Sequence, residues 1–171
     1  MKVTSAVANK MVKQLEEERA YWNQIEVESG TYTAAIGEDP VIPEYDYREV
    51  TEKRDAIDRK IVKIKHAVNV ANASNEVETE EGKLTIDALL VRMAQLNTRK
   101  FRLDEMRKQL PKVRLNSTAS WGGVSKAPEY RYLNYDVEQV KADFEEISRK
   151  ICSMQLALDK YNQTYEFEIE I

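Results

Sequence analysis

The sequence predicts a mainly α-helical protein in which four long helices form two antiparallel, coiled-coil-like hairpins. Charged residues make up 33% of the 171 residues, whereas the chain has only five glycines and four prolines. This balance is typical of long solvated helices. Apolar residues recur at alternating spacings of three and four in four segments of similar length, which favours paired hairpins over an irregular helical fold.

The first two helices are predicted at about residues 5–28 and 46–73. Each carries one charge in its apolar seam, Glu18 in the first and Arg54 in the second. An antiparallel alignment of the seams places Glu18 opposite Arg54. We expect the two charges to pair and to set the register, because either one alone would be costly to bury. The same alignment pairs Met11 with Ile61, Leu15 with Ile57 and Trp22 with Val50.

The third and fourth helices are predicted at about residues 86–110 and 136–161, with Pro111 ending the third. The fourth has an unbroken apolar seam, whereas Lys100 and Arg107 take two seam positions in the third. We expect these helices to form the second antiparallel hairpin. The alignment pairs Leu110 with Val137, Leu103 with Phe144, Leu96 with Ile151, Met93 with Met154, Leu89 with Leu158 and Ile86 with Tyr161.

Short strands are predicted within residues 112–135 and at the C-terminal residues 165–171, where apolar residues alternate with glutamates. Within one chain, only the link at residues 75–84 lies within easy reach of the C-terminal strand. Pairing with the strands predicted within residues 112–135 would require a second subunit, or a long excursion of the chain that folds back. Two strands alone are marginally stable in water, and an uncovered apolar face seeks a partner. We therefore expect self-association into at least a homodimer.

Length and composition indicate one helical domain covering residues 1–171. The net charge of −4 gives no global electrostatic footprint for nucleic acid. Cys152 is the single cysteine, so no intrachain disulfide is expected and a reducing cytoplasm fits best. The N-terminal segment never builds the apolar region of a signal peptide, and no run of about 18 apolar residues occurs, so we expect no membrane partner.

No catalytic, cofactor or metal signature survives a check of its spacing. His66, the only histidine, follows Lys63 by three residues, where a di-iron bundle needs a glutamate. The glutamate pairs at 16–17 and 80–81 lack the third carboxylate of a magnesium-binding helix. Cys152 has no histidine nearby in the sequence to activate it. We expect no catalytic residue, metal or cofactor; an enzyme of unrecognised type is a third hypothesis.

A basic stretch at residues 92–114 is the basis of an alternative function, nucleic-acid binding. It holds eight Lys or Arg residues against two acidic ones, and aromatic residues follow that could stack on single-stranded bases. The cations could instead complement the C-terminal end of the third helix, with the aromatic residues closing the end of the bundle. The candidate nucleic-acid-binding residues are Arg99, Lys100, Arg102, Arg107, Lys108 and Trp121.

Polar residues also gather where the second helix ends and the third begins. Asn69 and Asn72 lie in the last turns of the second helix, and Asp87 and Arg92 lie in the first turns of the third. Only a short link separates the two groups, so we expect them at one end of the molecule. They could cap helices and bond turns. They are also the candidate residues of a small polar ligand site.

The same segments carry a family resemblance. The motifs NVAN at 69–72 and GKLTIDALLVR at 82–92 are followed by an aromatic-rich segment, a last heptad helix and an alternating strand. This pattern, over about residues 55–171, resembles a bacterial family of small uncharacterised helical proteins often labelled septicolysin. The motifs are of moderate specificity. The chain departs from the family in its longer 29–45 loop and in having Tyr165 where a tryptophan is expected. It also resembles hypothetical proteins carried on integron cassettes.

The septicolysin label implies a haemolysin. A pore former needs a membrane-competent amphipathic segment and an export route, and neither is visible in the sequence. Our leading hypothesis is therefore a non-enzymatic, self-associating helical protein whose work is binding. Its partner is another protein or a small polar ligand at the Asn69/Asp87 end.

Overall fold

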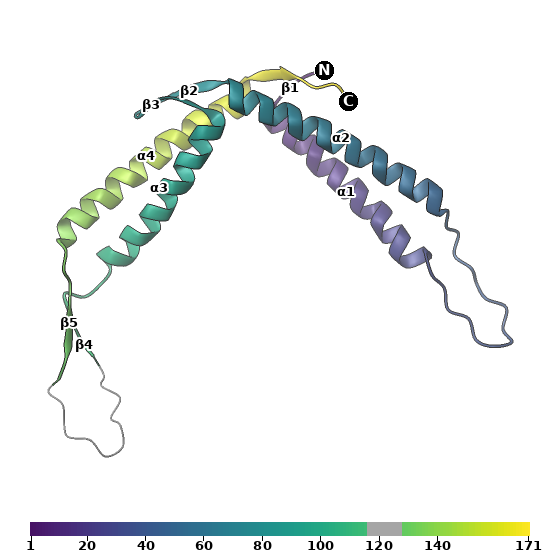
Figure 1. The fold of residues 1–171 in the computed structure, drawn as a ribbon, viewed down its shortest axis with the longest axis horizontal. Coiled ribbons are helices and arrows are strands. Elements are labelled where there is room, and N and C mark those ends of the chain that lie inside the picture. Colours follow the sequence, from purple (N-terminus) through teal and green to yellow (C-terminus); the bar gives the residue numbers. More distant parts are fainter. Residues whose placement is uncertain (116–127) are drawn as a thin grey trace, which may run out of the picture.

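The computed structural model describes residues 1–115 and 128–171. Over these residues the chain forms four long helices and six short strands, which confirms the predicted mainly α-helical class. The helices are α1 (Ser5–Ser29), α2 (Tyr47–Ser74), α3 (Ile86–Arg107) and α4 (Val137–Thr164). Figure 1 shows that α1–α2 and α3–α4 form two hairpins, which meet at one end and diverge as the arms of an open arch.

Side-chain caps determine where three of the helices begin. Thr4, Asp46 and Asp136 each lie just before a helix, and their side-chain oxygens accept hydrogen bonds from N–H groups of its first turn. These N–H groups have no partner within the helix itself, so the caps stabilise the first turn. At the start of α3 the hydroxyl of Thr85 donates instead to the carboxylate of Asp87.

Hairpin α3–α4 packs in agreement with the predicted register. Lys100 and Arg107, the two cations in the seam of α3, both lie over the ring of Phe144 on α4. The Lys100 Nζ is 5.5 Å and the guanidinium carbon of Arg107 is 4.1 Å from the ring centroid. The aromatic face stabilises these charges at the edge of the seam. The core of this hairpin comprises Ile86, Leu89, Met93, Leu96, Met154, Leu158 and Tyr161.

The end of α3 corrects the predicted pairing of Leu110 with Val137. The helix ends at Arg107, and Leu110 is 67% exposed. The reason is the following Pro111, which disfavours helical geometry in the residue before it and offers no N–H for a continuing helix. The apolar seam of α3 therefore closes at Leu103, which is fully buried.

Hairpin α1–α2 forms as predicted, but its predicted register is wrong. Arg54 Nη1 lies 2.5 Å from Glu26 Oε2, whereas Glu18, the predicted partner of Arg54, is exposed. Glu26 lies eight residues beyond Glu18, which corresponds to roughly 12 Å along the helix at about 1.5 Å per residue. A seam with a seven-residue repeat presents similar apolar residues after a slip of one repeat, so the apolar pattern alone could not select the register.

Ion pairs between the two helices accompany the observed register. Arg19 Nε lies 2.9 Å from Asp58 Oδ1, and Lys65 Nζ lies 3.0 Å from Glu16 Oε1. Their side chains are about half exposed, so each pair contributes little by itself. Together with Arg54–Glu26 they favour one of several registers that the apolar residues allow.

The six strands form three separate two-stranded antiparallel sheets. Sheet β1–β6 joins the two ends of the chain, and β2–β3 and β4–β5 are hairpins. The bounds are β1 (Lys2–Thr4), β2 (Glu76–Thr79), β3 (Gly82–Thr85), β4 (Lys112–Arg114), β5 (Tyr130–Tyr132) and β6 (Glu166–Glu168). Gly82 has a φ of +104° at the β2–β3 turn, a conformation that favours glycine.

The C-terminal strand has a different partner from the one predicted. It pairs with β1, with Val3 opposite Phe167, rather than with the 75–84 link, which folds on itself as β2–β3. Val3 and Ile169 are buried in the core of α1–α2. The strand is therefore covered within one chain, and it no longer supplies a reason for self-association. The prediction missed β1 because three residues are too few to show a strand alternation.

At the apex of the arch, strands cross from each hairpin to the other. The strand β2 continues α2 but packs on hairpin α3–α4, where Val77 and Leu84 contact the core. The strand β6 continues α4 but packs on hairpin α1–α2, where Phe167 and Ile169 contact the core. Figure 1 shows these strands running over the top of the arch. The crossing joins the two arms.

The core of α3–α4 gives a first prediction about stability. Leu96→Ala removes a side chain that is 6% exposed, and we expect a loss of roughly 2–5 kcal/mol in the free energy of unfolding, because a cavity remains. The matched control is Val91→Ala on the same helix, at a side chain that is 60% exposed. Urea denaturation measures both. Equal losses would contradict the assigned core.

The register of α1–α2 gives a second prediction. A double-mutant cycle with Glu26→Gln and Arg54→Gln should show a coupling energy of roughly 0.2–1 kcal/mol, since both side chains are only partly exposed. The same cycle with Glu18→Gln and Arg54→Gln should show coupling near zero. A larger coupling energy with Arg54 for Glu18 than for Glu26 would support the register that was predicted from the sequence.

Candidate functional site

The predicted ligand residues lie near the apex, but they do not form one convergent site. Asn69 is exposed on α2, and Asn72 is half-buried, with an Oδ1 atom that has no hydrogen-bond partner among the described residues. Asp87 accepts a hydrogen bond from Ala88 N at 2.8 Å. Arg92 forms a bidentate pair with Glu81, at 2.7 and 2.8 Å. Ligand binding by these residues stays a prediction, and two of them already have structural partners.

The charges at this end are held in their ionised forms. The hydrogen bond from Arg92 lowers the pKa of Glu81 below its usual value. The hydrogen bond from Thr85, and then that from the Ala88 backbone, lower the pKa of Asp87. A general acid or base at neutral pH needs a pKa near 7, so these carboxylates are tuned away from that role. Asp87 instead bonds to groups at the start of α3, and Glu81 joins the β2–β3 link to α3 through Arg92.

Two open grooves lie side by side at the apex, and both include Tyr165. The ring of Tyr165 stacks on that of Tyr161, with centroids 5.0 Å apart, and burial raises the pKa of Tyr161. A groove of about 520 Å³ is lined by Val77, Glu78, Ala157, Lys160, Tyr161, Thr164 and Tyr165. A second of about 400 Å³ is lined by His66, Ala67, Val70, Ala71, Ser74, Asn75, Tyr165, Phe167 and Glu168.

These grooves were not predicted from the sequence. They arise where β2 and β6 cross the helix ends, and the tyrosines that line them looked like ordinary seam and strand residues. His66 lines one groove and is exposed on α2. Within the described parts of the chain, His, Cys, Asp and Glu side chains form no group of three or more that could hold a metal ion.

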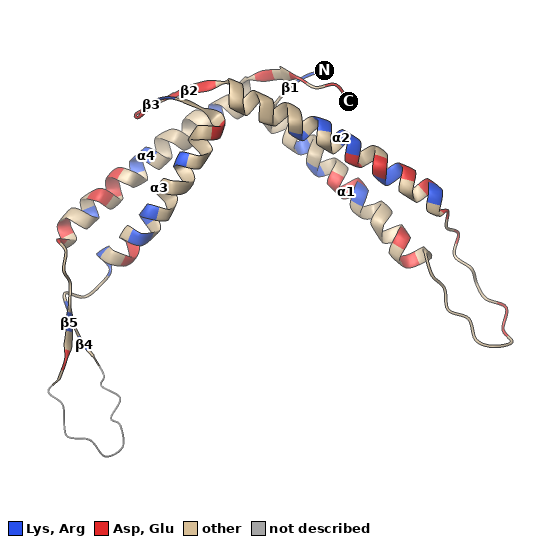
Figure 2. Cartoon of the chain, viewed as in Figure 1, with Lys and Arg blue, Asp and Glu red and all other residues tan. Residues whose placement is uncertain are grey.

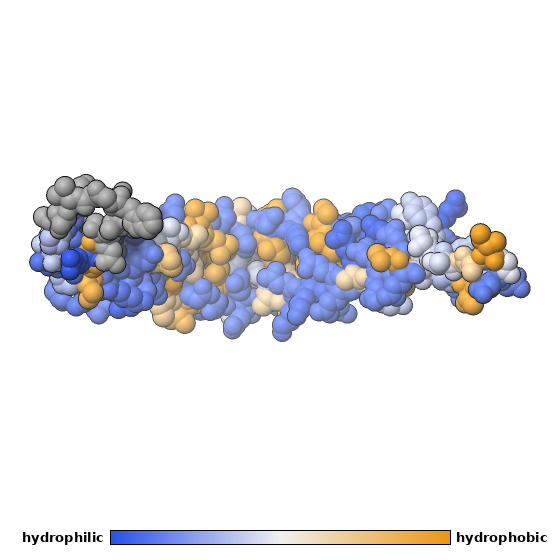
Figure 3. Space-filling model, turned by 90° about the horizontal axis from the view of Figure 1, so that it is seen from below, coloured by the Kyte–Doolittle hydropathy of each residue, from blue (hydrophilic) through white to orange (hydrophobic). Residues whose placement is uncertain are grey.

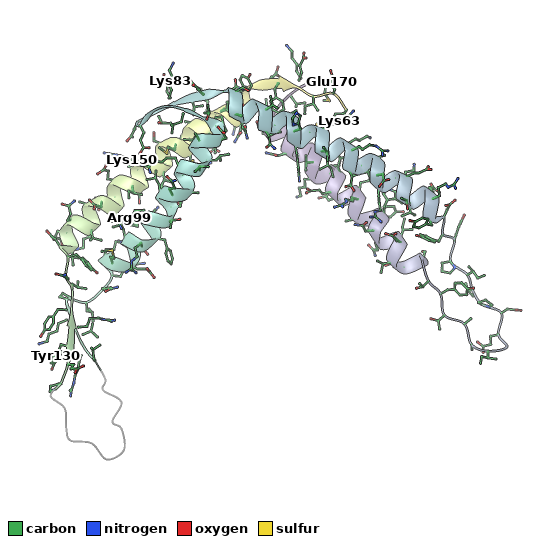
Figure 4. All side chains as sticks on the ribbon, viewed as in Figure 1. Lys63, Lys83, Arg99, Tyr130, Lys150 and Glu170 are labelled. Atoms are coloured by element: carbon green, nitrogen blue, oxygen red, sulfur yellow. The ribbon has the colours of Figure 1, made fainter. Side chains whose placement is uncertain are left out.

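Three of the six predicted nucleic-acid-binding residues are paired with acidic side chains of α3. Arg107 and Lys108 both contact Asp104, at 2.6 and 2.5 Å, and these bonds lower the pKa of Asp104. Arg102 pairs with Glu105 at 3.0 Å. Arg99 is exposed on α3 (Figure 4). The position of Trp121 lies outside the described residues.

The ribbon β4–β5 presents cations and tyrosines on one face. Lys112 is paired opposite Tyr132, and Arg114 opposite Tyr130. The Lys112 Nζ lies 4.1 Å from the ring centroid of Tyr130 and 5.4 Å from that of Tyr132, close enough for cation–π attraction. Both rings are exposed. Figure 4 shows Tyr130 at the far end of the α3–α4 arm.

The loop between α1 and α2 forms the other end of the arch. Ile36 is fully exposed and Val41 is 91% exposed, and Tyr32 and Ile42 are exposed as well. Residues 30–46 hold four acidic residues and no Lys or Arg. Figure 2 shows acidic residues and no basic ones along this loop. The two ends of the arch thus differ in charge while both expose apolar or aromatic side chains.

Comparisons with known proteins give a likeness of fold. No family model matches the chain, and no curated protein matches it. A crystal structure of a functionally unknown conserved protein from Corynebacterium diphtheriae superposes with a TM-score of 0.64. It is 13% identical and covers 98% of this chain and 100% of its own. The likeness shows the fold alone. In the described parts of this chain, no helix is long and apolar enough to cross a membrane.

The Glu81–Arg92 pair gives a third prediction. Because the pKa of Glu81 is lowered in the folded state, the pair stabilises the fold above the unfolded pKa of about 4.3. Its contribution is lost as the pH falls through the lower folded pKa. The Tm of the Arg92→Gln variant should therefore lie below that of the native chain at pH 7, and the difference should shrink by pH 3.

Thermal unfolding followed by circular dichroism between pH 3 and pH 7 measures this difference. The matched control is Lys10→Gln, which removes one positive charge from an exposed position on α1. The control should leave the Tm difference from the native chain nearly constant with pH. A difference for Arg92→Gln that grows as the pH falls would show that the pair does not act as described.

Proposed function

We propose that this protein is a non-enzymatic, self-associating interaction protein whose binding surfaces lie at the ends of its two arms. The observation that carries the proposal is where the exposed apolar and aromatic side chains gather. Such side chains also occur singly along the helices, but several lie together on the loop of residues 30–46 and on the ribbon β4–β5, at opposite ends of the arch. Contiguous exposed apolar surface in a folded protein marks interaction sites.

The distribution of surface polarity supports binding by surfaces rather than by one cavity. Figure 3, seen from below the arch, shows apolar residues in separate groups along a mostly hydrophilic face, with one group at the end of the α1–α2 arm. The apex grooves are open to solvent and mostly apolar in lining. A small-molecule site usually combines a closed apolar pocket with convergent polar groups, and such convergence is weak here.

A small polar ligand at the Asn69/Asp87 end is a less supported form of the same proposal. Asp87 and Arg92 already bond to neighbouring groups, so a ligand would have to displace those bonds. The unpaired Oδ1 of Asn72 is the group that favours this form.

Nucleic-acid binding is the second candidate function, and the ribbon β4–β5 favours it. Its exposed tyrosines beside Lys112 and Arg114 could stack on single-stranded bases and contact phosphates. Against it stand the net charge of −4 and the acidic partners of Arg102, Arg107 and Lys108. Its signature would be a binding constant that falls steeply with salt, because phosphate contacts release counterions.

The single cysteine, Cys152, is exposed, a position that suits a reducing compartment because exposed thiols oxidise readily. We therefore expect the protein to act in the cytoplasm.

The proposal gives a fourth prediction, on assembly. Sedimentation velocity of the intact chain over a hundredfold range of concentration should show a species of at least twice the monomer mass of 19.8 kDa. The exposed apolar groups at the arm ends provide the driving force, so the larger species should grow with concentration. A monomer over the whole range would contradict self-association.

A further inference from the structure

We propose that two copies of this chain join end to end, with the loop of each copy on the ribbon of the other, to close a two-fold ring. The proposal rests on the proposed self-association and names the surfaces that would carry it. The acidic loop is defined as residues 30–46, and the basic ribbon as residues 112–115 and 129–133.

The acidic loop offers negative charge beside apolar side chains. Glu38, Asp39 and Glu44 are exposed and lack a salt-bridge partner among the described residues. Ile36 and Val41 lie beside them and are almost entirely exposed. Such a segment gains by contact with a surface that supplies both cations and rings, because apolar burial then adds to charge complementarity.

The basic ribbon supplies the matching groups. Lys112 and Arg114 are exposed on the same face as the tyrosines, and Arg131 is exposed on the opposite face; Glu129 is the one acidic residue of the ribbon. The tyrosines on its face are amphipathic, and such rings are enriched in protein interfaces. A two-stranded ribbon is marginally stable by itself in water, so a partner that covers one face would also stabilise it.

The arch prevents these two surfaces from meeting within one chain. Figure 1 places the loop and the ribbon at the two open ends of the arms, far from each other. The longer helices of the two arms, α2 and α4, both have 28 residues, so the arms are of similar length. A rotation of 180° in the plane of the arch brings the loop of one copy to the ribbon of the other at both ends.

Symmetry then decides between a ring and a chain. A contact between two different surfaces forms a closed ring if the rotation between copies closes, and an open filament if it does not. With two copies, both loop–ribbon contacts are identical and both are used. Exposed ion pairs are individually weak and are screened by salt. We therefore expect assembly that depends on apolar contacts and weakens as the ionic strength rises.

Charge reversal at one surface at a time tests the pairing. The loop variant carries Glu38→Lys, Asp39→Lys and Glu44→Lys, and the ribbon variant carries Lys112→Glu, Arg114→Glu and Arg131→Glu. Each variant alone has loop and ribbon of the same sign, so each should sediment as a monomer of 19.8 kDa. In an equimolar mixture both contacts again join opposite charges, and the mixture should recover a species of twice that mass.

The matched control reverses three exposed glutamates away from the arm ends, on the β2–β3 link and at the C-terminus: Glu76→Lys, Glu80→Lys and Glu170→Lys. It changes the net charge as much as the loop variant does and should assemble as the native chain does. Circular dichroism of every variant confirms that the helices are retained. If the mixture forms a dimer, the loss of assembly in each variant alone is not due to misfolding, because two misfolded chains would not form a defined dimer together.

Several outcomes would overturn the ring. Either variant alone remaining dimeric, or a mixture remaining monomeric, would show that the loop and the ribbon do not pair. Species larger than a dimer whose proportion rises with concentration would show that the copies form an open filament instead of a ring. A monomeric native chain would overturn self-association itself. If the ribbon variant then also lost salt-dependent binding to a single-stranded oligonucleotide, the ribbon would be assigned to nucleic acid.

Discussion

The reciprocal crossing of strands at the apex determines the shape of this molecule. Each hairpin core is completed by residues that follow a helix of the other hairpin, with Val77 contacting one core and Ile169 buried in the other. The backbone N–H of Ile169 donates to the carbonyl of Met1 at 2.9 Å, so both ends of the chain meet here. The helices form locally, but their arrangement depends on contacts between residues far apart in sequence, which close late and at an entropic cost.

Because the apex holds the arms apart, each arm is stabilised mainly by the apolar contacts between its own two helices. The buried residues follow α1–α2 and α3–α4 as two separate clusters, and burial thins out toward the arm ends. Apolar side chains also stay in water at the two ends, on the loop and on the ribbon. The same constraint places the acidic loop and the basic ribbon where they cannot neutralise each other within one copy. The shape of the fold and the location of its exposed surfaces therefore have one cause.

Features that depend on residues near one another in sequence, such as the helices, were predictable. Arrangements that depend on contacts between residues far apart in sequence were not. Helical periodicity located the four helices, and the phase of the α3–α4 seams indicated a register with which the positions of Lys100 and Arg107 over Phe144 agree. The α1–α2 register failed because its selection depends on Glu26, which lies outside the apolar pattern. The site prediction located Asp87 and Arg92 near the apex, but the bonds that occupy them come from Thr85 and from Glu81 in the β2–β3 link. Spacing along one helix gives no information about such partners.

The position of the C-terminal strand determines whether the apex is open to a second copy of the chain. From the sequence, an alternating strand without a partner was the exposed apolar surface that a second copy should cover. In the structure that strand is covered by β1 and by the core of α1–α2, so assembly cannot be driven from the apex by that route. Exposed apolar side chains remain at several places, and one of these is the loop of residues 30–46, whose charged residues are all acidic. Across the arch from it lies a ribbon with an excess of positive charge. The fold holds the acidic loop and the basic ribbon of one chain apart, and in the proposed assembly each would meet its complement on a second copy.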